Sequence, residues 1–243
     1  MTRPADWWKL LAGLCLVFAL FHWLALAAGS DRGQAGILVG AVVVIATAAA
    51  DLLLFGAAPA RVLGHLGLGV PAVRGVFVAT AVSGLLLLVV PAYLAATNTP
   101  FDMYPGWLLL LPGLFAQAGI AEEVLFRGYL FRHVRAGRSF RQAALVASGP
   151  FVLVHLLLFA TMPWPIALAS VLLAALMSFP LAYLFELGGN TVWGPAILHW
   201  VAQGAVKVVL PAESVPVFPF VWIAASAIIP FLVFLATPRS LRR

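Results

Sequence analysis

Polar residues are sparse along this chain, and the positions between them form long apolar runs. These runs lie at roughly 8–28, 36–55, 73–96, 106–132, 141–160, 166–187, 191–210 and 217–237. Most of them approach the ~20 residues that an α-helix needs to cross a hydrocarbon core. Because water is absent there, each crossing segment must satisfy its own backbone hydrogen bonds, which favours helices. The pattern therefore predicts an all-α fold, a polytopic transmembrane helical bundle of about eight helices.

Turn-forming residues separate the apolar runs, as in Asn98-Thr99-Pro100 and Gly188-Gly189-Asn190. We find no internal repeat and no low-complexity tract, and we expect residues 1–243 to form a single integral membrane domain. The composition agrees, because 64% of the residues are hydrophobic and only 9% are charged. A soluble domain of this size needs more charge to cover its surface. The first run is long and lacks a convincing cleavage site, which favours a membrane helix over a removed signal peptide.

The net charge of +6 could indicate nucleic-acid binding in a soluble protein. Here the basic residues stand between apolar runs, so we expect the lipid bilayer as partner and no nucleic acid. They gather before the first run and in alternate connections: Arg3, Lys9, Arg61, Arg74, Arg132, Arg135, Arg138, Arg141, Arg239, Arg242 and Arg243. The positive-inside rule then predicts that both termini are cytoplasmic. We expect a multi-pass protein of a bacterial-type inner membrane.

Ionisable residues inside predicted membrane segments are candidates for function. A charge at mid-bilayer costs at least ~2.5–3.5 kcal/mol on insertion scales. Three of the runs carry such residues or an adjoining amide: Glu122, Glu123 and Arg127 in the fourth, His155 in the fifth, and His199 and Gln203 in the seventh. We interpret these six residues as the candidate site.

Their spacing predicts a common depth in the membrane. The fourth and fifth runs should form a hairpin, and the midpoint between Glu122 and His155 falls at its basic turn, at Arg138. His199 follows Asn190 by nine residues, which is ~14 Å along a helix. Glu122 should lie at a comparable depth, so three ionisable side chains from three helices should share one layer of the membrane.

Helical periodicity also predicts how the side chains face. Glu123 and Arg127 are four apart and can form an ion pair on one face. Glu122 is turned about 100° away and is free for another partner. His199 and Gln203 are also four apart and should project from one face of their helix.

Such a set of groups favours hydrolysis. A buried carboxylate next to a histidine can hold a water molecule and take its proton. A second histidine and an amide can stabilise the oxyanion that develops. The same side chains allow an alternative, because Glu122, His155 and His199 would form a His₂Glu zinc site with one position open for water. The sequence lacks His-Glu-x-x-His, so no local motif demands a metal.

Other ionisable residues receive structural interpretations. Asp51 lies near the predicted cytoplasmic end of the second segment, and we expect it to pair with a basic residue there. The remaining ones lie near predicted helix ends or stand alone: His22, His65, His133, Glu186 and Lys207.

The motifs of the candidate site resemble the CPBP family of intramembrane proteases, which includes the CAAX prenyl endopeptidases and bacterial Abi-type proteins. The family pattern is Glu-Glu-x-x-x-Arg, then Phe-x-x-x-His, then His-x-x-x-Asn. It is matched in order within residues 107–210, by Glu122, Glu123 and Arg127, by Phe151 and His155, and by His199. Gln203 departs from the pattern, because asparagine is usual at that position.

The resemblance implies an intramembrane endopeptidase whose substrate is a membrane-associated protein or peptide. It implies that Glu122 and His155 activate the water, and that Glu123 and Arg127 support them. It also implies that His199 and the amide at Gln203 stabilise the transition state. We favour a metal-free mechanism without a cofactor and keep a zinc-dependent protease as an alternative. A catalytically silent membrane scaffold or immunity-type protein is a further alternative, favoured by Gln203.

Overall fold

The structure is a computed structural model that describes residues 6–29, 33–211 and 217–236. Helices account for nearly all of it. The longer ones are α1 (Trp7–Ala27), α2 (Gln34–Phe55), α4 (Val73–Leu87), α5 (Val89–Thr97), α6 (Trp107–Leu114), α8 (Phe140–His155), α9 (Trp164–Leu187), α10 (Trp193–Val208) and α11 (Phe218–Ile228). Short elements continue or connect them: η2 (Pro59–Arg61), α3 (Val62–His65), η3 (Phe115–Ala121), η4 (Val124–Phe131), α7 (Arg132–Arg135), η5 (Leu156–Ala160) and η6 (Ile229–Ala236).

The predicted polytopic helical bundle is confirmed. In the described residues, seven continuous helices are long and apolar enough to cross a membrane: Trp7–Ala27, Gln34–Phe55, Val73–Thr97, Trp107–Arg135, Phe140–Ala160, Trp164–Leu187 and Phe218–Ala236. The predicted run at 191–210 corresponds to α10, which has 16 residues. At ~1.5 Å per residue α10 is ~24 Å long, shorter than the other spans.

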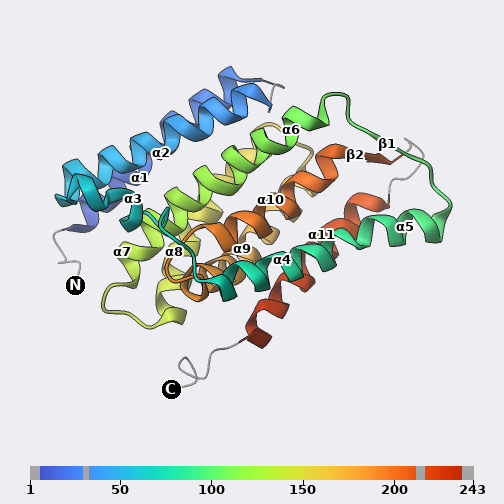
Figure 1. Cartoon of the computed structure of the whole chain (residues 1–243). Coiled ribbons are helices and arrows are strands. Elements are labelled where there is room, and N and C mark those ends of the chain that lie inside the picture. The colour runs from blue at the N-terminus through green and yellow to red at the C-terminus, as the bar shows by residue number, and fades with distance from the viewer. Residues whose placement is uncertain (1–5, 30–32, 212–216, 237–243) are drawn as a thin grey trace.

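The helices lie side by side, with α1 and α2 as an antiparallel hairpin along one side (Figure 1). α10 packs against α4, α9 and η3 and so lies inside the bundle. One end of the bundle carries α3 and α7, and the other carries a small antiparallel ladder of β1 (Phe101–Met103) and β2 (Val209–Pro211) (Figure 1). The sequence pattern did not predict this ladder. We call the end with α3 and α7 the basic end, after Arg61, Arg74, Arg132, Arg135, Arg138 and Arg141.

Contacts between these basic residues and distant segments show that they belong to one end. Arg132 donates hydrogen bonds to the carbonyls of Gly64 and His65. Arg74 donates to the carbonyl of Ala236, at the end of η6, over 2.6 Å. Arg135 pairs with Glu186, near the end of α9, over 2.5 Å. The segments that carry the predicted cytoplasmic loops therefore meet at the same end.

Many large apolar side chains face outward, as expected for helices in lipid. Leu53 of α2 is 84% exposed and Leu235 of η6 is 81% exposed. The buried apolar residues form one cluster around Leu125 and Tyr129 and another around Leu184 and Leu198. The long fourth span contributes to the first cluster together with α1, α2 and α8, while α9 and α10 contribute to the second together with α4 and α11. The interior therefore forms around the helices that carry the candidate site.

Local sequence signals explain several helix boundaries. Gly56 ends α2 in the left-handed conformation with φ of 67°, where a Cβ would be strained. Asn98 ends α5 in the same way with φ of 48°. Ser139 and Gln142 form a capping box that starts α8 directly after the basic turn.

The fourth span differs from the regular helix that the sequence predicts. It is π-helical in η3 and again in η4, and Glu122 and Glu123 lie at the junction between these two segments. π-Helical turns are rare and are found mainly at functional sites, because the wider i→i+5 turn redirects side chains. Periodicity of apolar residues cannot predict such a turn.

Candidate active site

The fourth span supplies a buried ion pair. The side chain of Glu123 is fully buried, and its Oε1 accepts a hydrogen bond from Arg127 Nη1 over 2.9 Å. This pair was predicted and is confirmed. The guanidinium carbon of Arg127 also lies 4.4 Å from the ring centroid of Phe151 in α8. Both contacts hold the Arg127 charge away from lipid.

α10 adds His199 and Gln203 to the same cluster. His199 Nδ1 lies 2.6 Å from Glu123 Oε1, a contact that the sequence did not predict. The carboxylate can only accept, so Nδ1 carries the hydrogen. Gln203 Nε2 lies 2.9 Å from His199 Nε2, on the shared face that the spacing predicted.

Glu122 is turned toward a different environment from Glu123. Its side chain is 16% exposed, and its Oε2 lies 3.7 Å from His199 Nε2. That distance is longer than a hydrogen bond. Glu122 is therefore close to the cluster but keeps acceptor capacity, as expected for a group that would bind water.

α8 brings His155 to the site through a backbone contact. Its Nδ1 donates to the carbonyl of Phe151 over 2.7 Å, so the lone pair of the neutral ring is on Nε2. The charged groups that act electrostatically on His155 are Glu122, His199 and Arg127. The three helices thus bring together the predicted site residues.

Phe151, the first residue of the Phe-x-x-x-His motif, is only 2% exposed. Its ring lies 4.7 Å from the His155 ring and 6.1 Å from the His199 ring, centroid to centroid. Phe126 of η4 packs on it at 4.8 Å. These aromatic contacts fix the orientation of both imidazoles.

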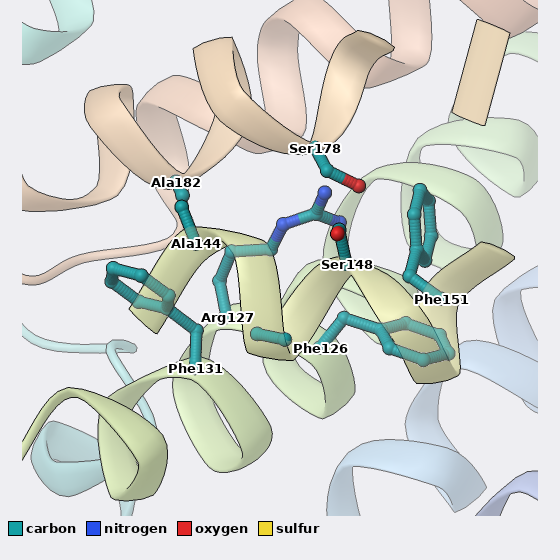
Figure 2. A pocket seen from close by; sticks show the side chains of 9 residues that line it. Phe126, Arg127, Phe131, Ala144, Ser148, Phe151, Ser178 and Ala182 are labelled. Atoms are coloured by element: carbon teal, nitrogen blue, oxygen red, sulfur yellow. The ribbon is translucent and has the colours of Figure 1, made fainter. Parts of the chain in front are cut away.

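A small cavity of about 10 Å³ adjoins the site beside Arg127. Ser148 of α8 and Ser178 of α9 line it, and Figure 2 shows the guanidinium of Arg127 reaching between these two hydroxyl groups. That volume is about what one water molecule needs. The polar lining makes it suited to hold a water close to the ion pair.

The residues of the zinc alternative lie near one another but are not arranged as ligands. Within the described part of the chain, no group of three His, Cys, Asp or Glu side chains could hold a metal ion. Both nitrogens of His199 already have partners, Glu123 and Gln203. We therefore derive no step through a metal, and the absence of a cofactor stays a prediction.

The fold and these contacts define a polytopic membrane protein with a buried carboxylate–histidine cluster, a set of groups suited to hydrolysis. Residues 104–205 match the family model described as type II CAAX prenyl endopeptidase, Rce1-like. This match confirms the resemblance to the CAAX prenyl endopeptidases that was drawn from the motifs of the chain. All six candidate site residues fall inside the match. No curated protein matches the chain.

Sequence reasoning missed the contact between Glu123 and His199, which are 76 residues apart. It assigned Glu123 to Arg127 alone, because periodicity reports only neighbours on one helix. It also missed Phe126, which is one of many apolar residues in the fourth run. No local signal distinguishes either feature.

Proposed function

We propose that the protein is an intramembrane endopeptidase that hydrolyses a peptide bond with a water activated by Glu122 and His155. One observation carries the proposal. Glu122 and His155 come from different helices, Glu122 acts electrostatically on His155, and each retains an acceptor atom without a hydrogen bond to the described part of the chain. A water molecule between them could donate one hydrogen to each.

In the proposed reaction, Glu122 accepts a proton from the water as its oxygen attacks the scissile carbonyl carbon. A tetrahedral intermediate forms, and its oxyanion is stabilised by an N–H of Gln203. Protonated Glu122 then gives its proton to the amide nitrogen as the C–N bond breaks. Glu123 and Arg127 contribute indirectly, because their ion pair anchors His199.

The substrate we propose is a membrane-associated protein, because the site lies within helices long enough to cross a bilayer. The family name suggests a prenylated C-terminal segment as the first substrate to test. We place the basic end in the cytoplasm, following the positive-inside rule. Both termini would then be cytoplasmic, in a bacterial-type inner membrane.

The test is Glu122→Gln, which removes the base but keeps the size of the side chain. We expect cleavage to fall by a factor of about 10² or more, with no change in expression or in the thermal midpoint. Cleavage is followed as a shortened species in membrane proteomes of cells with the active or the variant protein. Glu186→Gln is the matched control, because it makes the same change at the basic end.

Full cleavage by Glu122→Gln would refute the role of this carboxylate. If the parent protein itself yields no shortened species, the silent scaffold becomes the better interpretation.

We also propose that the reaction needs no metal, since both nitrogens of His199 are engaged within the protein. Purified protein should then lack stoichiometric zinc, and chelators should leave its activity unchanged. Chelator inhibition that is reversed by added zinc would establish the zinc alternative instead.

A further inference from the structure

We propose that Gln203 is a positioning residue that keeps Nε2 of His199 unprotonated and so keeps Glu122 free to act as the base. This inference rests on the proposed function for its catalytic consequence. The tautomer itself can be measured without any turnover.

The first step concerns His199 Nδ1. It lies 2.6 Å from Glu123 Oε1, and Glu123 is fully buried and paired with Arg127. A carboxylate held by an arginine is a strong acceptor, so the hydrogen of a neutral imidazole resides on Nδ1. The lone pair of the ring is then on Nε2.

The second step concerns the two groups that face His199 Nε2. Gln203 Nε2 lies 2.9 Å away and Glu122 Oε2 lies 3.7 Å away. The amide nitrogen only donates, so this hydrogen bond requires the lone pair on His199 Nε2. Had Nε2 carried a hydrogen, the imidazolium would instead attract the Glu122 carboxylate.

The third step concerns the length of the side chain. His199 and Gln203 are one turn apart on α10, and the amide of Gln203 must reach back along the helix. An asparagine would be one methylene shorter. We therefore attribute the contact to the extra methylene of glutamine at this position.

As a consequence, the two hydrogens of the Gln203 amide have different partners. One hydrogen of Gln203 Nε2 occupies the lone pair of His199, and the second is left for the developing oxyanion. Since His199 cannot donate to Glu122 in this tautomer, the carboxylate is not drawn into an ion pair. Glu122 keeps the acceptor capacity that a general base needs.

The test uses the full chain in lipid nanodiscs with ¹⁵N-labelled histidine. The chain has five histidines, and a His199→Asn variant identifies the two resonances of His199 by their loss. At neutral pH we expect one protonated nitrogen and one lone-pair nitrogen on His199. Gln203→Met, which keeps the length but removes the donor, should raise the protonated fraction of Nε2.

Gln34→Met is the matched control, because Gln34 is exposed at the start of α2, and it should leave the spectrum unchanged. Two results would overturn the inference. They are a protonated Nε2 in the parent protein, and a His199 spectrum that Gln203→Met does not alter.

The effect on catalysis is tested by measuring kcat and KM with a fluorogenic farnesylated CAAX peptide as the probe. We expect Gln203→Met, which also removes the oxyanion donor, to lower kcat about 10²-fold or more. Gln203→Asn keeps a donor and should lower kcat about 3- to 10-fold, the effect of one hydrogen bond, and KM should be unchanged in both variants. A Gln203→Asn variant with parental kcat and parental His199 resonances would contradict the length argument. A parent that shows the lone-pair Nε2 but no turnover would refute the protease and leave the tautomer assignment standing.

Discussion

In the described part of the bundle, two groups of acid and imidazole side chains each surround a fully buried carboxylate, and they are organised differently. The first, which we call the basic-end cluster, consists of Asp51 of α2, His65 of α3, and Arg132 and His133 of α7. Asp51 is fully buried, with Oδ2 2.7 Å from His65 Nδ1 and Oδ1 3.4 Å from His133 Nε2. Arg132 donates to backbone carbonyls of the α3 segment. Each member of this cluster therefore connects one helix to another segment.

The candidate site uses the same residue types but keeps part of its capacity open. Glu123 Oε1 contacts both Arg127 and His199, much as Asp51 contacts two histidines, and both carboxylates are fully buried. Glu122 and His155 are different, because Glu122 Oε2 lies 3.7 Å from His199 Nε2, beyond hydrogen-bond distance, and His155 uses Nδ1 for its contact with the carbonyl of Phe151. The comparison teaches that a buried carboxylate between imidazoles is not by itself a sign of catalysis. What distinguishes the two clusters is a second carboxylate at the candidate site, Glu122, whose side chain is partly exposed and whose Oε2 is too far from His199 for a hydrogen bond.

Breaking the buried ion pair should give the largest effect on stability. Arg127→Leu leaves the charge of Glu123 buried without its partner, which should lower the free energy of unfolding by about 3–5 kcal/mol. The thermal midpoint in nanodiscs measures this. Arg135→Leu is the control, since it breaks a pair at the end of the bundle, and we expect about 0–1 kcal/mol there. Equal losses in the two variants would contradict the assignment of Arg127.

Removing the carboxylate of the basic-end cluster should lower the stability of the protein without lowering its activity. Asp51→Ala removes the partner of two imidazoles, and we expect a loss of about 1.5–3 kcal/mol. Turnover per folded molecule should stay at the parental value, measured with the same farnesylated peptide. A variant that folds normally and has lost its activity would place Asp51 in the reaction and erase the distinction between the clusters.

A smaller effect on stability is expected at the contact between the fourth span and the segment after α3. Gly128 of η4 packs against the carbonyl oxygen of Leu66, and a Cβ at Gly128 would overlap it. Gly128→Ala should displace the segment after α3 and cost about 1–3 kcal/mol. Gly149→Ala in α8 is the control, because a Cβ there meets open space, and it should change stability by about 1 kcal/mol or less. Similar midpoints for the two variants would show that the α3 segment is not tightly docked.

The sequence alone predicted much of the fold. The ends of the apolar runs lie within three residues of the ends of the seven long helices and of α10. Helix spacing predicted the Glu123–Arg127 pair and the shared face of His199 and Gln203. These features follow from hydrophobicity and from a repeat of 3.6 residues, which both act locally. The prediction that Asp51 pairs with a basic residue is also confirmed, with His65 as its partner.

Other features depended on the tertiary structure, because they join residues that are distant in sequence or that defy regular periodicity. The π-helical turns beside Glu122 and Glu123 depart from the repeat that a sequence reports. The contact between Glu123 and His199 arises because α10 packs against the fourth span. Hydrophobic periodicity determines which segments become helices, but the packing of one helix on another determines which nitrogen of an imidazole meets which oxygen. That choice, made by packing, decides which atoms of the site are left to bind water.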